Sequence, residues 1–128
     1  MDFWLMAAHA GVMKKATHPE DLARLFVEYA NAGDADSMAQ LYAEDAVLDF
    51  PAGNPTIGRD AIRAVLKQLV AARPQFTVEQ PLPTLINGDI ALTATVPADG
   101  TGGRTQVARR QPDGTWLRIL DRPERATK

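Results

Sequence analysis

Few residues in this sequence could do chemistry, and the best candidate is the carboxylate of Asp121, near the C-terminal end. Residues 104–111 and 115–121 are predicted to be strands, and the letters PDG between them are typical of a hairpin turn. A two-residue turn at residues 113–114 places Gln106 directly opposite Asp121. Because opposite side chains project from the same face of a sheet, that face carries an amide beside a carboxylate.

The same register places Ala108 opposite Ile119, adds Leu117 to this face and puts Arg118 on the other face. A carboxyl group that apolar neighbours remove from water is a potential general acid or base. Three interpretations of Asp121 therefore stay open. It is a residue at the sheet's rim paired with an arginine, a polar group that contacts a ligand, or a catalytic acid or base.

Other chemical machinery is not indicated. Residues 53–60 (GNPTIGRD) have the glycine spacing of a phosphate loop, but they lack its lysine and its hydroxyl residue. The two histidines, His9 and His18, lie in or beside the N-terminal segment, and no cluster has metal-ligand spacing. The single serine, Ser37, falls on a predicted helix without a histidine nearby. We therefore expect no metal and no cofactor.

Length and composition set the broad class. A chain of 128 residues with 45% hydrophobic and 23% charged residues is typical of one globular domain. Its formal net charge of -2 argues against nucleic-acid binding, which favours a basic face. The lack of cysteine excludes disulfides and thiolate chemistry, and it suits a cytoplasmic location.

We divide the chain into an N-terminal extension (residues 1–16), a domain (residues 17–123) and a C-terminal tail (residues 124–128). The extension begins with an apolar run followed by lysines, the reverse of a secretory signal, and the run is too short to span a bilayer. We expect no membrane partner. The extension is an extra helix packed on the domain, a disordered or upstream-start segment, or a contact in an oligomer.

Three helices are predicted in the first half of the domain. The first covers residues 19–34, the second follows Asp34 or Asp36, and the third follows Gly58. Their inner faces carry apolar side chains at helical spacing, namely Leu22, Leu25, Phe26 and Tyr29, then Met38, Leu41 and Tyr42, then Ile62, Val65, Leu66 and Leu69.

Strands are predicted around and after these helices. Residues 46–50 (AVLDF) form a short strand closed by Pro51. After the third helix, residues 76–80, 84–86 and 90–96 read as strands, followed by the hairpin described above. Helices first and antiparallel strands afterwards indicate an α+β fold.

Four short motifs, in this order and at this spacing, resemble the NTF2-like family. They are NAGD at residues 31–34, LYAEDAV at 41–47, GRDAIR at 58–63 and RRQPDGTW at 109–116. This family includes ketosteroid isomerases and SnoaL-like polyketide cyclases. The resemblance implies a cystatin-like cone, in which the N-terminal helices pack in the concave face of a curved, mostly antiparallel sheet. It also implies a pocket at the open end and a homodimer.

The resemblance identifies the positions that carry isomerase chemistry. The family's base falls at Phe50, its pocket tyrosine at Phe26 and its oxyanion aspartate at Gln106. Because phenylalanine can neither take nor give a proton, we do not expect steroid isomerisation by the usual route. The resemblance also places the hairpin face with Asp121 inside the pocket, where SnoaL-like cyclases use a carboxylate.

The sequence thus predicts a SnoaL-like domain of unassigned specific function that binds a small hydrophobic or cyclic molecule. The predicted pocket contains the candidate acid Asp121 together with Phe26, Tyr42, Phe50, Leu66, Gln106, Ala108 and Ile119. One alternative is a general acid–base enzyme that uses Asp121. A second is a structural or dimerisation domain. We expect a homodimer through the outer face of the sheet, where Val107, Trp116 and Leu120 are predicted to project.

Overall fold

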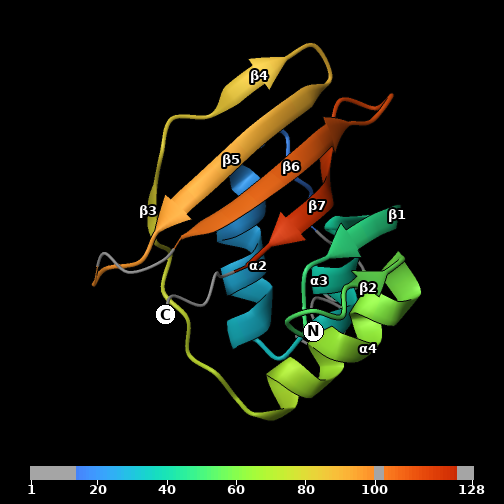
Figure 1. Ribbon diagram of the computed structural model, residues 1–128, viewed down its shortest axis with the longest axis vertical. Coiled ribbons are helices and arrows are strands. Elements are labelled where there is room, and N and C mark those ends of the chain that lie inside the picture. The colour runs from blue at the N-terminus through green and yellow to red at the C-terminus, as the bar shows by residue number, and fades with distance from the viewer. Residues whose placement is uncertain (1–13, 100–102, 124–128) are drawn as a thin grey trace, which may run out of the picture.

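The computed structural model describes residues 14–99 and 103–123, and in them the helices pack against one face of a twisted sheet (Figure 1). The helices are α2 (Asp21–Asn31), α3 (Ala35–Ala39) and α4 (Arg59–Ala71). The strands are β1 (Tyr42–Leu48), β2 (Thr56–Ile57), β3 (Gln80–Pro81), β4 (Leu85–Asn87), β5 (Ile90–Val96), β6 (Arg104–Arg110) and β7 (Trp116–Arg122). The predicted α+β class is confirmed.

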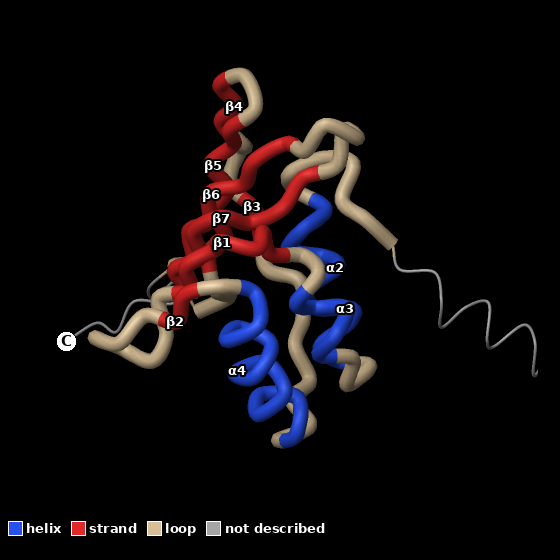
Figure 2. Tube along the Cα trace, turned by 90° about the vertical axis from the view of Figure 1, so that its right-hand side faces the viewer, coloured by secondary structure: helices blue, strands red, loops and turns tan. Residues whose placement is uncertain are grey.

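The sheet runs in the order β2-β1-β7-β6-β5-β3, and β4 also pairs with β5. Only β1 and β7 are parallel among the paired strands of the described residues, so the sheet is mostly antiparallel, as predicted. Figure 2 shows the three helices on one side of this sheet. The core therefore lies between the helices and the inner face, and no helix among residues 14–99 and 103–123 covers the outer face.

Local signals explain the first two helices. The apolar stripe of α2 is buried at Leu22, Leu25 and Tyr29, and Gly33 follows the helix with the positive φ of +73° that glycine tolerates best. The Asp34 carboxylate caps α3 by accepting a hydrogen bond of 3.1 Å from the Ser37 amide.

The region after α3 differs from the prediction. The second helix was expected to include Leu41 and Tyr42, but it ends at Ala39. Residues 46–50 were expected to be the first strand, but β1 covers Tyr42–Leu48. The reason is pairing with β7, since the Arg118 amide donates to the Leu41 carbonyl oxygen at 2.9 Å. A partner strand overrides the weak local preference here.

Residues 76–80 were predicted to be a strand, and this is wrong for most of their length. Only β3, Gln80–Pro81, pairs in the sheet. Upstream, the backbone of Phe76 is satisfied by a side chain, because its amide donates to Asn31 Oδ1 at 2.8 Å and its carbonyl accepts from Asn31 Nδ2 at 2.9 Å. An asparagine side chain thus replaces a neighbouring strand.

The β6–β7 hairpin has the predicted strands but a different register. The Gln111 amide donates to the Thr115 carbonyl at 2.7 Å, so the turn contains three residues, 112–114, instead of two. Ala108 consequently pairs with Arg118, and the predicted pairing of Ala108 with Ile119 is wrong.

A β-bulge then restores the predicted register further along the hairpin. Ile119 is the extra residue on β7, because Ala108 pairs with Arg118 whereas Val107 pairs with Leu120. Gln106 lies opposite Asp121, as predicted. The predicted pairing is correct because the longer turn and the bulge cancel each other.

The predicted extension and tail fall largely on residues 1–13 and 124–128, which lie outside the described residues. The end of the extension packs on the domain, since Ala16 is buried and its carbonyl accepts from the Trp116 amide at 2.9 Å. Within residues 14–99 and 103–123, the structure contains no helix of the length and hydrophobicity needed to span a membrane.

Candidate functional site

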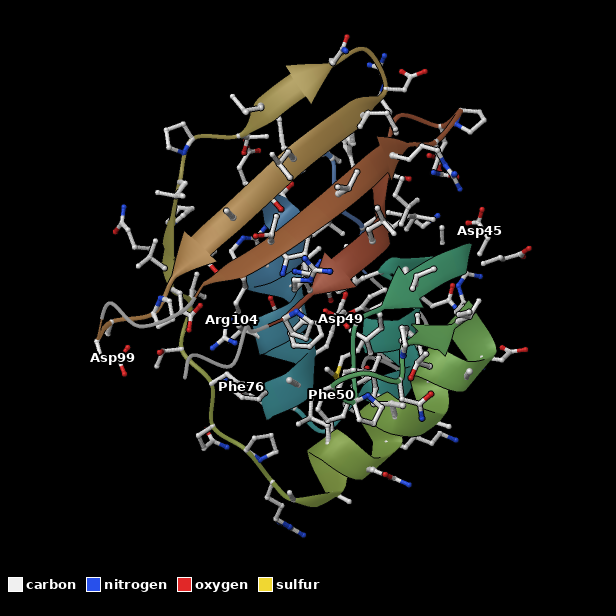
Figure 3. The ribbon with its side chains drawn as sticks, viewed as in Figure 1. Asp45, Asp49, Phe50, Phe76, Asp99 and Arg104 are labelled. Carbon is white, nitrogen blue, oxygen red and sulfur yellow. The ribbon has the colours of Figure 1, made fainter. Side chains whose placement is uncertain are left out.

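A cavity of about 530 Å³ opens where β1 and β7 end and β6 begins. Helices α2 and α4 form one side, the strands form the other, and residues 76–79 form part of the rim. Figure 3 shows Phe50, Phe76 and Arg104 gathered at this end of the sheet. The apolar lining consists of Ala23, Phe26, Val27, Leu48, Phe50, Val65, Leu66, Leu69, Phe76, Val78 and Pro123. The polar lining consists of Tyr42, Gln68, Thr77, Glu79, Thr95, Arg104, Gln106, Arg118 and Asp121.

Most of the residues that the sequence assigned to the pocket line this cavity, namely Phe26, Tyr42, Phe50, Leu66, Gln106 and Asp121. Two do not. Ala108 is buried in the core between sheet and helices, and Ile119 is the bulge residue of β7. Ala108 shares the inner face with Gln106 but lies further along β6, in the closed core. The assignment of Ile119 depended on the two-residue turn, which the structure replaces with a longer one.

Asp121 accepts hydrogen bonds from side chains on three strands. Tyr42 Oη on β1 donates to Oδ2 at 2.5 Å, and Gln106 Nε2 on β6 donates to Oδ1 at 3.1 Å. Arg118 Nη1 on β7 lies 3.4 Å from Oδ2 and completes an ion pair. The Asp121 side chain is only 2% exposed. Both carboxylate oxygens are therefore occupied by protein donors.

The network extends behind Gln106. Its Oε1 accepts from Thr93 Oγ1 at 3.3 Å, which orients the amide with its nitrogen toward Asp121. The sequence left open a position for Asp121 at the sheet's rim, paired with an arginine. In the structure Asp121 does pair with an arginine, Arg118, but the pair is buried inside the cavity and not at the rim of the sheet.

Arg118 is the residue that sequence reasoning missed. Strict alternation along β7 placed it on the outer face, whereas its side chain is 5% exposed and lines the cavity. Its guanidinium lies over the Phe26 ring, 5.1 Å from the centroid, and 5.8 Å from the centroid of the Tyr42 ring. Among the described residues, its Nε has no hydrogen-bond partner. No signal in the sequence marks the bulge that turns it inward.

Burial and neighbouring charges set the protonation states of the donors. Burial, together with the adjacent Asp121 carboxylate, raises the pKa of Tyr42 well above its ordinary value. The phenol therefore stays protonated and donates a hydrogen bond to Asp121. Burial by itself would lower the pKa of Arg118. Asp121 and Tyr42 outweigh that effect and raise the pKa, so the guanidinium stays charged.

A second polar group lies at the rim of the cavity. Arg104 Nε and Nη2 each donate to a different oxygen of Glu79 at 2.8 Å, and Arg104 Nη1 donates to the Pro123 carbonyl at 2.7 Å. Thr95 Oγ1 adds a hydrogen bond of 3.0 Å to Glu79 Oε1. The hydrogen bonds from Arg104 lower the pKa of Glu79 despite partial burial. Glu79 and Asn31 thus anchor the two ends of the segment 76–79.

The chemistry of the cavity lining is set by its apolar walls and a small number of charged groups. The described part of the chain contains no group of three or more histidine or acidic side chains that could hold an ion. The cavity instead has apolar walls and a buried pair of opposite charges at Arg118 and Asp121. Small-molecule pockets in general combine apolar walls with a small number of polar groups in this way.

The curved sheet, with helices on one face and a cavity between them, has the cystatin-like fold of NTF2-like proteins. The SnoaL-like domain matches residues 23–121, well over half of the chain. The chain therefore belongs to the SnoaL-like domain family. No protein of curated function matches the sequence.

Solved structures support the same fold. An NTF2-like protein with a cystatin-like fold from Novosphingobium aromaticivorans is 21% identical, with a TM-score of 0.61 over 80% of this chain and 75% of that chain. A ketosteroid isomerase-like protein from Erwinia carotovora atroseptica is 19% identical, with a TM-score of 0.64 over 84% of this chain and 94% of that one. An NTF2-like protein of unknown function from Pseudomonas putida is 19% identical, with a TM-score of 0.64 over 85% and 84%. At such identities the likeness concerns the fold alone.

Proposed function

We propose that this SnoaL-like domain binds a small, mostly apolar molecule in its cavity. The observation that carries the proposal is the cavity itself. Its volume of about 530 Å³ is within the usual range of ligand pockets, and its walls are mainly aliphatic and aromatic. The same volume argues against the alternative of a purely structural domain whose cavity has collapsed. A cytoplasmic location stays a prediction from the sequence.

The binding test uses the uncharged dye Nile red, whose fluorescence rises in apolar surroundings. Val65 lines the cavity from α4, so Val65→Trp should fill part of it and weaken the fluorescence rise at least several-fold. Ala64→Trp is the matched control, because Ala64 is the exposed neighbour on the same helix. Equal dye binding by all three proteins, with circular dichroism showing each folded, would refute binding in this cavity.

A general acid–base enzyme that uses Asp121 is the second candidate. It is supported by a buried carboxylate on the cavity, 2.5 Å from a phenol. It is opposed by the buried ion pair, because a proton on Asp121 would remove the negative charge that balances Arg118. Deuterium exchange at the α-carbon of α-tetralone, followed by NMR, tests it. Asp121→Asn should abolish any catalysed exchange and spare binding.

A homodimer through the outer face of the sheet is the assembly that we propose. Cross-strand pairing aligns one apolar residue from each of several neighbouring strands on this face, in the order Leu85, Leu92, Val107, Leu120, Val47 and Ile57. Leu120 is 49% exposed and Leu85 64% exposed. Trp116, which the sequence also assigned to this face, is buried. A continuous apolar row of this extent is typical of a surface that another subunit covers.

A further inference from the structure

We infer that the cavity's ligand carries an uncharged hydrogen-bond acceptor, such as a carbonyl oxygen, and that the Arg118 guanidinium binds this acceptor. The inference rests on the proposed binding function and adds the chemistry of the ligand's polar end. From the sequence, Asp121 was the residue expected to contact the polar end of a ligand, and Arg118 was assigned to the outer face. The inference gives that contact to Arg118.

Among the polar groups at the bottom of the cavity, the acceptor Asp121 is largely occupied, whereas N–H donors of Arg118 are unpaired. Asp121 already accepts from Tyr42, Gln106 and Arg118, and these contacts engage both of its oxygens. The Tyr42 proton is committed to Asp121 at 2.5 Å. Only one accepting position, on Oδ1, is therefore left for a hydroxyl or amine of the ligand.

Arg118 is in the opposite situation. A guanidinium has five N–H donors. The hydrogen bonds recorded for its side chain both come from Nη1, at 3.4 Å to Asp121 and 3.5 Å to Tyr42, which are long contacts. Its Nε is buried without a partner among the described residues. Its Nη2 makes no hydrogen bond among the described residues either, and it is not fully buried, so an acceptor on a ligand in the cavity can reach Nη2 and satisfy a donor of this buried side chain.

Charge balance decides that the acceptor is uncharged. Asp121 neutralises Arg118 inside the cavity, and Glu79 pairs with Arg104 at the rim. A carboxylate on the ligand would bring an additional negative charge close to Asp121, between apolar walls that do not solvate it. A carbonyl oxygen takes the hydrogen bond without that penalty.

The guanidinium is also held in place before a ligand arrives. The centroids of the Phe26 and Tyr42 rings lie 5.1 Å and 5.8 Å from the guanidinium carbon, and contact with two rings limits the freedom of the planar group to turn. Little side-chain entropy remains to be lost when an acceptor binds. The apolar remainder of the ligand would then pack against wall residues such as Phe50, Leu66 and Leu69.

The test compares four probes of one shape, namely tetralin, α-tetralone, α-tetralol and tetralin carboxylate, by titration of amide chemical shifts. We expect α-tetralone to bind about tenfold more tightly than tetralin, the effect of one hydrogen bond to a charged donor. Transfer from water alone favours tetralin, because the ketone is the less hydrophobic probe. The alcohol and the carboxylate should bind more weakly than the ketone.

Variants of Arg118 test whether this residue causes the preference for α-tetralone over tetralin. In the double variant Arg118→Met with Asp121→Asn, which leaves no unpaired buried charge, the preference for α-tetralone over tetralin should disappear. Arg118→Lys, which keeps a charged donor, should retain part of it. The wild-type comparison holds even where a variant fails to fold.

Each result has a defined meaning. Equal binding of ketone and hydrocarbon by the wild type, or a preference that survives the double variant, overturns the role of Arg118 and leaves the proposed function intact. Tightest binding of the carboxylate overturns the uncharged acceptor, and tightest binding of the alcohol overturns the preference for an acceptor without a proton to donate. If neither tetralin nor α-tetralone shifts resonances of cavity residues and Nile red also fails to bind, the proposed function falls, and this inference falls with it.

Discussion

Arg118 and Asp121 are three positions apart on one strand, yet both side chains are buried on the cavity side, with Nη1 3.4 Å from Oδ2. In a regular strand, residues three apart project from opposite faces. The bulge at Ile119 reverses the alternation between them and brings the two charges together. A local irregularity thus creates the ion pair on which the chemistry of the cavity depends.

Removing one partner of this pair should be strongly destabilising. Arg118→Met leaves the Asp121 carboxylate buried without its cation, and the free energy of unfolding in urea should fall by about 3–5 kcal/mol. The double variant Arg118→Met with Asp121→Leu should recover most of that loss. Arg109→Met is the control, because its ion pair with Asp45 is largely exposed and should contribute at most about 1 kcal/mol. Equal losses at the two arginines would contradict the prediction.

Tyr42→Phe should separate the contribution of the Tyr42 hydroxyl to stability from that of its ring. It keeps an aromatic face beside Arg118 but removes the donor to Asp121, and we expect a loss of about 1–3 kcal/mol in urea unfolding. Thermal or chemical unfolding with no measurable change would show that the hydroxyl contact is not made in solution.

The same residue should affect stability in alkali. The pKa of Tyr42 is higher in the folded protein than its ordinary value of about 10, so above that pH the unfolded chain releases a proton that the folded chain retains. The free energy of unfolding then falls as pH rises, by about 1.4 kcal/mol per pH unit for each such proton. Tyr29, whose pKa is also raised, chiefly by burial, contributes in the same direction. Tyr42→Phe should flatten the slope by one proton, and an unchanged slope would argue against a buried phenol.

Glu79 should anchor the rim segment in a pH-dependent way. Its folded pKa is below the ordinary value of about 4.5, so its contribution is present above that pH and is lost as pH falls through the folded pKa. Glu79→Gln should cost about 0.5–1.5 kcal/mol at neutral pH and speed amide hydrogen exchange in residues 76–79. Glu44→Gln, at an exposed position of β1, should change neither quantity. Unaltered exchange in the Glu79 variant would show that Arg104 does not hold the segment.

The proposed dimer depends on the apolar row of the outer face. Leu120 lies in the middle of that row, so Leu120→Lys should convert the protein to a monomer in sedimentation velocity at micromolar concentration. Ala61→Lys, on the exposed side of α4, should leave the association unchanged. A wild-type protein that sediments only as a monomer would exclude this assembly.

The sequence alone determined what depends on neighbouring residues. The stripe of α2, with Leu22 and Leu25, follows from helical spacing, and the turn between β6 and β7 follows from the letters PDG. These signals predicted the order of helices and strands. The pairing of Gln106 with Asp121 also came from them, although it depended on two errors of register that cancelled.

The tertiary structure decided everything that depends on a distant partner. Tyr42 belongs to β1 because β7 pairs with it, and the rim segment starts where it does because Asn31 binds the backbone of Phe76. Arg118 lines the cavity because β7 contains an extra residue, and no local preference of isoleucine at position 119 specifies a bulge. Periodicity reports the average direction of side chains along an element, whereas one inserted residue reverses every direction beyond it.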